Sequence, residues 1–86
     1  MTVTLRLFAA AREAAGRSVD EFDPAEVSTV GALLDAATAA YGPAFAAVLG
    51  NSRCWLNGDE AASGRATTLA DGDEVAVLPP VSGGIA

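Results

Sequence analysis

The sequence predicts an α+β fold, in which a mixed sheet of four to five strands carries one main helix across one face. The first observation is size, because 86 residues, 51% of them hydrophobic, suit one small domain with a packed core. The second is that the first and last apolar segments alternate as strands do. The third is that one long segment between them repeats its apolar residues at helical spacing. These patterns predict one helix packed on one sheet.

The first strand is predicted over residues 2–8. Its inward side chains are Val3, Leu5 and Leu7, and alternation turns Phe8 to the other face. Residues 9–15 are rich in alanine and predict a short helical turn, which Gly16 ends. Residues 17–22 predict a second strand, with Val19 directed inward.

The main helix is predicted to begin after Ser28 or Thr29, either of which is a good N-cap. Its apolar stripe consists of Val30, Leu33, Leu34, Ala37 and Tyr41. Gly42 and Pro43 stop this helix, and Pro43 opens a further helical turn that extends to Leu49.

Three shorter strands are predicted in the second half, over residues 53–56, 60–62 and 74–78. Asn57-Gly58 predicts a hairpin turn between the first two, and Pro79-Pro80 ends the last. Because the first and last strands are the most apolar, we expect them to lie parallel at the sheet centre. This is the β-grasp arrangement, with a domain over residues 1–78 and an extended, flexible tail over residues 79–86.

The charged residues exclude several classes of function. Five basic and eleven acidic residues give a net charge of −6 without a basic run, so nucleic acid is not an expected partner. The acidity suits either a basic surface on a partner protein or simple solubility. The chain has no histidine and no lysine, which excludes histidine-assisted nucleophiles and Schiff-base chemistry. We expect no bound cofactor and no metal site, and we interpret the carboxylates Asp20-Glu21 and Asp71, Asp73 and Glu74 as solvated.

Cys54 is the one cysteine of the chain, which excludes an internal disulfide and favours a cytoplasmic setting. We expect its side chain to face inward and to have no relay function, because free cysteines are among the most buried residue types. The N-terminal residues lack the continuous apolar stretch of a signal peptide or membrane helix. No membrane association is therefore expected.

Three sequence blocks resemble the sulfur carriers of the MoaD/ThiS family, whose fold is ubiquitin-like. The blocks are Leu7-Phe8-Ala9-Ala10-Ala11-Arg12-Glu13 followed by Gly16, Thr29-Val30-Gly31-Ala32-Leu33, and Leu69 to Val75 running into Leu78-Pro79-Pro80-Val81-Ser82-Gly83-Gly84. The first block is similar to the small subunit of molybdopterin synthase, MoaD. Thiamine-type carriers usually lack it.

The resemblance implies that the carboxyl group of Gly84 is the reactive group. An E1-like enzyme of the MoeB/ThiF type adenylates this group with ATP, and sulfur transfer then gives a thiocarboxylate. The thiocarboxylate then donates its sulfur to a precursor pterin held by a large subunit of the MoaE type, in molybdopterin synthesis. The residue types of the tail fit this activity, because Gly83 and Gly84 have no side chains and let the tail enter a narrow enzyme channel. Pro79 and Pro80 stiffen the tail before Val81 and Ser82.

Ile85 and Ala86 follow Gly84, whereas the family uses a free glycine carboxylate. We expect a protease to remove them; the alternatives are that they are foreign to the protein or that this copy is inactive. Two other functions stay open. One is a sulfur carrier for cysteine, thiamine or a secondary metabolite, and the other is a protein modifier or interaction module without sulfur transfer.

The expected docking surface is the sheet face opposite the helix. Alternation places Phe8, Trp55, Ala76 and Leu78 there, and exposed apolar clusters favour protein binding. The alternative for Trp55 is that it covers an edge or packs under the loop of residues 63–68. Arg12 is expected either to meet an acidic partner surface or to pair with a carboxylate nearby.

Overall fold

The computed structural model of the chain describes residues 1–80. The elements are β1 (Val3–Leu7), α1 (Ala9–Ala15), β2 (Val19–Phe22), α2 (Val30–Tyr41), α3 (Pro43–Leu49), β3 (Arg53–Leu56), β4 (Asp59–Glu60), the 3₁₀ helix η1 (Gly64–Ala66) and β5 (Glu74–Leu78). The predicted mixed sheet with a main helix is confirmed, and the sheet has five strands.

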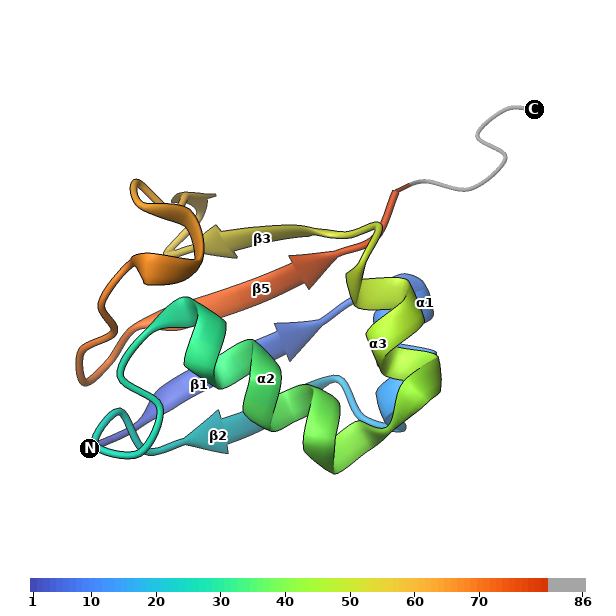
Figure 1. Cartoon of the computed structure of the whole chain (residues 1–86), viewed down its shortest axis with the longest axis horizontal. Helices are drawn as coiled ribbons and strands as arrows, with labels where there is room; N and C mark the ends of the chain where they lie inside the picture. Colours follow the sequence, from blue (N-terminus) through green and yellow to red (C-terminus); the bar gives the residue numbers. More distant parts are fainter. Residues whose placement is uncertain (81–86) are drawn as a thin grey trace.

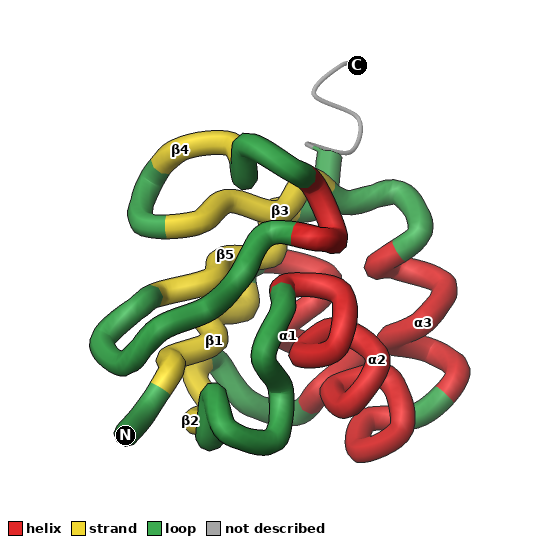
Figure 2. The backbone as a smooth tube through the Cα atoms, turned by 60° about the vertical axis from the view of Figure 1, so that its left-hand side comes forward, coloured by secondary structure: helices red, strands yellow, loops and turns green. Residues whose placement is uncertain are grey.

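The strand order is β2-β1-β5-β3-β4, so the first and last strands lie together at the centre. β1 and β5 are parallel, as the sequence predicts, and each of the other neighbouring pairs is antiparallel. The helices gather on one side of this sheet, with α2 running across it (Figures 1 and 2). No helix of residues 1–80 lies on the opposite side of the sheet, which is called the open face below.

The core lies between the sheet and the helices. Val3, Leu5 and Leu7 of β1 are 0–1% exposed, and Val75 and Val77 of β5 are fully buried. The core also includes Ala11, Val27, Val30, Leu33, Leu34, Ala37, Phe45 and Leu69. The predicted inward positions of the two central strands are therefore confirmed.

The main helix begins where the sequence predicts. The Thr29 side chain caps α2 by accepting a hydrogen bond from the backbone N–H of Ala32 at 3.1 Å. Gly31 allows a close approach of η1, since a Cβ atom there would lie 3.0 Å from the Cβ and carbonyl oxygen of Arg65. The helix ends at Gly42, whose φ of 97° favours glycine, and Pro43 starts α3.

The predicted start of the fourth strand at residue 60 is wrong. Asn57 and Gly58 have positive φ angles of 53° and 88°, so they form a two-residue turn and pairing resumes immediately at Asp59.

The predicted inward direction of Val19 is also wrong. Val19 is 45% exposed, and the partly buried positions of β2 are Asp20 and Phe22. Phe22 packs on the core, so alternation turns Val19 outward and Asp20 toward Tyr41, whose hydroxyl donates to Asp20 Oδ2 at 2.6 Å. Asp20 is therefore not the fully solvated carboxylate that the sequence predicts.

Candidate functional site

The tail leaves the domain directly from a central strand. β5 is paired on both sides, with β1 and with β3, and its Val75 and Val77 side chains anchor it in the core. Pro79 and Pro80 follow without backbone N–H groups, so the ladder ends at Leu78. The base of the tail is thus attached to one of the best-held segments of the fold.

The expected reactive residue Gly84 lies outside the described residues, as do Val81, Ser82, Gly83, Ile85 and Ala86. Their predicted functions stay predictions. The site described below is therefore the tail base and the surface around it.

The open face brings together three of the residues expected to bind a partner. Trp55 of β3 lies opposite Ala76 of β5, and Leu78 lies opposite Arg53 in the same ladder. Trp55, Ala76 and Leu78 are each half-buried. The loop of residues 63–68 lies against α2 instead, where Arg65 Nη2 donates to Asp35 Oδ1 at 2.8 Å. The open-face position expected for Trp55 is the one observed.

A hollow of about 380 Å³ opens beside the tail base, and we call it the tail-base hollow. Its walls are Asn51, Arg53, Trp55, Leu78, Pro79 and Pro80. Asn51 and Arg53 are absent from the site that the sequence predicts. Alternation along β3 could have identified Arg53, since it shares a face with Trp55, but only the sheet order shows that Asn51 reaches the tail.

The charged residues of the open face surround these apolar side chains. Arg6 Nε donates to Glu74 Oε2 at 2.5 Å, and Arg53 Nη1 lies 3.5 Å from Glu60 Oε2. All four side chains are largely exposed, at 44–76%. The face thus combines an apolar centre with a polar rim, which is the usual composition of a transient protein interface.

Phe8 and Arg12 stand at the tail end of the molecule. Phe8 directly follows β1, is 42% exposed, and its N–H donates to the Val77 carbonyl at 3.3 Å. Arg12 lies one helical turn further on, is exposed, and forms no ion pair with the described residues. The local pairing considered for Arg12 is therefore not present among residues 1–80.

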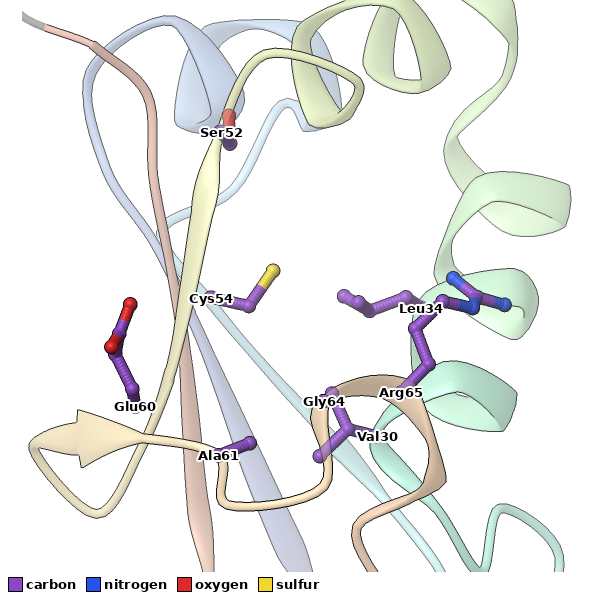
Figure 3. Close-up of a pocket in the computed structure, with 8 residues that line it drawn as sticks. All are labelled: Val30, Leu34, Ser52, Cys54, Glu60, Ala61, Gly64 and Arg65. Carbon is purple, nitrogen blue, oxygen red and sulfur yellow. The ribbon is translucent and has the colours of Figure 1, made fainter.

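Cys54 lies on the helix side of the sheet, not on the open face. Figure 3 shows its Sγ and the Leu34 side chain in the space between β3 and α2. That pocket has a volume of about 350 Å³, and Arg65 at its edge is hydrogen-bonded to Asp35 and to the Gly31 carbonyl. Burial raises the pKa of the Cys54 thiol, although Arg65 opposes the shift. A raised pKa disfavours the thiolate that a sulfur relay needs.

Two further ionisable groups with shifted pKa values, Tyr41 and Asp20, lie away from the tail. Burial raises the pKa of Tyr41, and its hydrogen bond to Asp20 raises it further. Burial also raises the pKa of Asp20, but hydrogen bonds from Tyr41 and the Glu21 N–H, together with Arg17, make the net shift downward. The Arg17 guanidinium also lies 5.6 Å from the centre of the Tyr41 ring. This cluster ties the end of α2 to β2 and is structural.

Among residues 1–80, no three histidine, cysteine, aspartate or glutamate side chains are grouped as metal ligands. No helix in that part of the chain is both long and apolar enough to cross a membrane.

Comparison with known proteins gives a consistent result. The sequence profile of the ThiS family matches residues 5–84. Small archaeal modifier protein 1 of Haloferax volcanii is 40% identical over 86 residues, covering 92% of this chain and 97% of its own. Its crystal structure superposes with a TM-score of 0.81 over 96% of this chain and 99% of that chain, at 35% identity.

Two structures connected with molybdopterin are also similar. A putative molybdopterin converting factor subunit 1 from Pyrococcus furiosus has a TM-score of 0.80 and 25% identity, covering 94% of this chain and 99% of that chain. The complex of subunits 1 and 2 of this factor from Helicobacter pylori matches with a TM-score of 0.69 and 23% identity, over 94% of this chain and 96% of that chain. The second match is evidence of fold alone.

Proposed function

This chain belongs to the ThiS family of ubiquitin-like sulfur carriers and modifiers, and we propose that its working group is the Gly84 carboxyl group, activated by an E1-like enzyme of the MoeB/ThiF type. In this proposal the enzyme uses ATP to adenylate Gly84, and sulfur transfer then gives a thiocarboxylate. The chain supplies the acyl group, and its partners supply the catalytic residues.

The observation that carries the proposal is the exit of the tail from the sheet. Pro79 and Pro80 continue a central strand and stand beside the tail-base hollow. Val81-Ser82-Gly83-Gly84 comes next in the sequence. A partner can therefore bind the folded domain at the hollow and receive the tail in a channel, which glycines enter most easily.

A second step precedes activation in this proposal. Gly84 is joined to Ile85 by a peptide bond, so its carboxyl group is not free in the sequence as written. A maturation protease that cleaves after Gly84 would release it.

Intact-mass measurement after incubation with the E1-like enzyme of the host, ATP and a sulfur donor tests the activation. A chain ending at Gly84 should gain the mass of sulfur in exchange for oxygen, whereas the chain that retains Ile85 and Ala86 should not. The same exchange on both chains would remove the need for maturation, and exchange on neither would overturn the proposal.

For the fate of the sulfur we propose molybdopterin synthesis with a large subunit of the MoaE type. The likeness to the Pyrococcus furiosus subunit, at 25% identity over nearly the full length of both chains, supports this assignment. The molybdopterin proposal predicts that the mature chain co-purifies with a large subunit from host cells. Two results together would contradict it: the thiocarboxylated chain elutes without a large subunit, and host cells that lack this chain still make molybdopterin normally. The sulfur would then serve the synthesis of cysteine, thiamine or another product.

The second candidate function is protein modification. It is favoured by the 40% identity to a protein named as a modifier. Activated Gly84 would then form an amide with a lysine of another protein, because this sequence contains no lysine to act as acceptor. Mass spectrometry of host proteins for lysines that carry the C-terminal fragment of this chain, which begins after Arg65 when trypsin is used, separates the two fates: the modifier proposal requires such sites, and the carrier proposal does not.

A further inference from the structure

Charge is distributed unevenly along the length of the sheet. At the end where β1 and β5 begin, Asp71 Oδ1 accepts a hydrogen bond from the Thr2 N–H and the Asp73 carbonyl accepts one from the Thr4 N–H. Glu74 begins β5, and Asp23 follows the β2 residue that pairs with Val3. This end is acidic, and it lies opposite the exit of the tail (Figure 1).

The tail end carries fewer charged side chains. Residues 36–52, which include α3 and lead into β3, contain no charged side chain. The one charged residue that lines the tail-base hollow is Arg53. Arg12 of α1 is also exposed; it forms no ion pair among residues 1–80, and the exposed Glu13 directly follows it. Arg53 is therefore the charged side chain that stands directly beside the base of the tail, and its nearest carboxylate is that of Glu60.

The ion pair of Arg53 is the longest of those that the arginines form with described carboxylates. Its distance to Glu60 is 3.5 Å, against 2.5, 3.2 and 2.8 Å for the pairs of Arg6, Arg17 and Arg65. The Arg53 and Glu60 side chains are 76% and 72% exposed. An exposed pair of this kind contributes little to stability, so a partner's carboxylate can replace Glu60 at small cost.

We propose that Arg53 determines which partner receives the tail: its guanidinium donates to a carboxylate at the mouth of the partner's channel, beside an apolar side chain of the partner seated in the tail-base hollow. This inference rests on the proposed function, since it concerns the enzyme that acts on Gly84. Trp55, Leu78 and Pro79 supply the apolar walls for that side chain. The acidic end of the domain repels the same partner, which orients the encounter so that the tail leads.

The length of the tail adds a geometric condition. Gly84 is the fourth residue after Pro80, and an extended chain of four residues spans at most about 14 Å. The partner's reacting centre must lie within that distance of the carboxylate and apolar side chain that meet the hollow. The proposed partner is thus a protein with an acidic-rimmed channel about 14 Å deep or shallower.

The test uses the chain ending at Gly84 and the host's E1-like enzyme, with ATP–pyrophosphate exchange as the readout. Arg53→Gln should raise the KM for the carrier about three- to tenfold and leave kcat unchanged, as expected for the loss of one rim charge. Arg53→Lys should restore part of this loss. Glu60→Gln should lower the KM, because it removes the competing carboxylate.

The matched control is Arg65→Gln. Arg65 is also exposed and also pairs with a carboxylate, Asp35, but it lies on the helix side of the sheet. Its KM should match that of the parent chain. Raising the salt concentration should increase the KM of the parent chain more than that of Arg53→Gln.

The outcomes separate the two levels of the proposal. No exchange with the parent chain overturns the proposed function, and the assignment of Arg53 with it. If exchange occurs but Arg53→Gln leaves the KM unchanged, or changes only kcat, the role proposed for Arg53 is overturned and the proposed function stands. Concentration-dependent dimers of the carrier that Arg53→Gln dissociates would also overturn it, because the hollow would then belong to a second copy of the chain.

Discussion

The two faces of the central sheet are formed by the same strands but differ in what covers them. In β1, Leu5 is fully buried under the helices, while its neighbour Arg6 is exposed on the open face and paired with Glu74. In β5, Val77 is fully buried and Ala76 beside it is half-buried. One face therefore stabilises the domain, and the other, with the tail base, is available for recognition. Single substitutions on each face can test this division.

The largest effect on folding is expected on the covered face. Leu5→Ala should lower the free energy of unfolding by about 2–5 kcal/mol, because it leaves a cavity between β1 and the helices. Urea denaturation followed by circular dichroism measures the loss. Arg6→Ala, one residue away on the open face, should cost no more than about 1 kcal/mol. Equal losses at the two positions would show that the faces do not differ as described.

The next effect should appear in binding and not in folding. Trp55→Ala should weaken binding to the E1-like partner at least about tenfold, as expected for a central aromatic anchor. Its cost in unfolding free energy should be smaller than that of Leu5→Ala. Isothermal titration calorimetry with the chain ending at Gly84 gives the affinity. Thr4→Ala, at the far end of the same face, is the control, and a similar loss of affinity there would argue against a docking surface centred on the tail base.

The third prediction concerns the cluster that joins β2 to α2. Tyr41→Phe should cost about 1.5 kcal/mol, because the hydrogen bond to the charged Asp20 is lost. The folded-state pKa of Asp20 is lowered, so the stabilisation is fully present above the carboxyl group's unfolded pKa and is lost as the pH falls through the folded value. Denaturation at neutral pH and at acid pH should show the gap between parent and Tyr41→Phe narrowing in acid. If the difference in unfolding free energy between the parent chain and Tyr41→Phe did not change with pH, the hydrogen bond would not depend on the charge of Asp20.

The smallest effect is expected where β1 leaves the sheet. Ala9 has a φ of 50°, in the left-handed region that favours glycine. Ala9→Gly should therefore raise the free energy of unfolding by up to about 1 kcal/mol without changing partner binding. Thermal unfolding and the same titration check both statements. Ala10→Gly, at the next position of α1, should be neutral or destabilising, and a gain there as well would remove the explanation by local strain.

Local patterns in the sequence predict the faces of the sheet well, because alternation of side chains is a property of the strand itself. Val3, Leu5 and Leu7 could be assigned inward, and Trp55 outward, without any knowledge of neighbours. The orientation predicted for Val19 is wrong, because Phe22 is the apolar residue of β2 that packs on the core, and alternation then turns Val19 outward and Asp20 toward Tyr41.

The sequence predicts those residues of the candidate site that belong to a local sequence pattern. It does not predict those that only the strand order of the sheet brings to the site. The tail motif and Trp55 could be identified along the sequence. Asn51 enters the site only because β3 lies next to β5, which brings residues before β3 beside Pro79. The fate proposed for Gly84 is less accessible still, because a sulfur carrier and a protein modifier would present the same acyl group, and the acceptor of that group or of its sulfur lies outside this chain.

The parallel pairing of β1 and β5 has a mechanical consequence. β5 leads directly into the tail and is hydrogen-bonded to strands on both sides. A pull on the tail acts along the strand axis, so it loads the hydrogen bonds of both ladders in shear and at the same time. If an enzyme pulls on the tail, the hydrogen bonds that hold β5 to β1 and β3 must therefore break together and not one at a time. The domain would then stay folded while the end of the tail reacts.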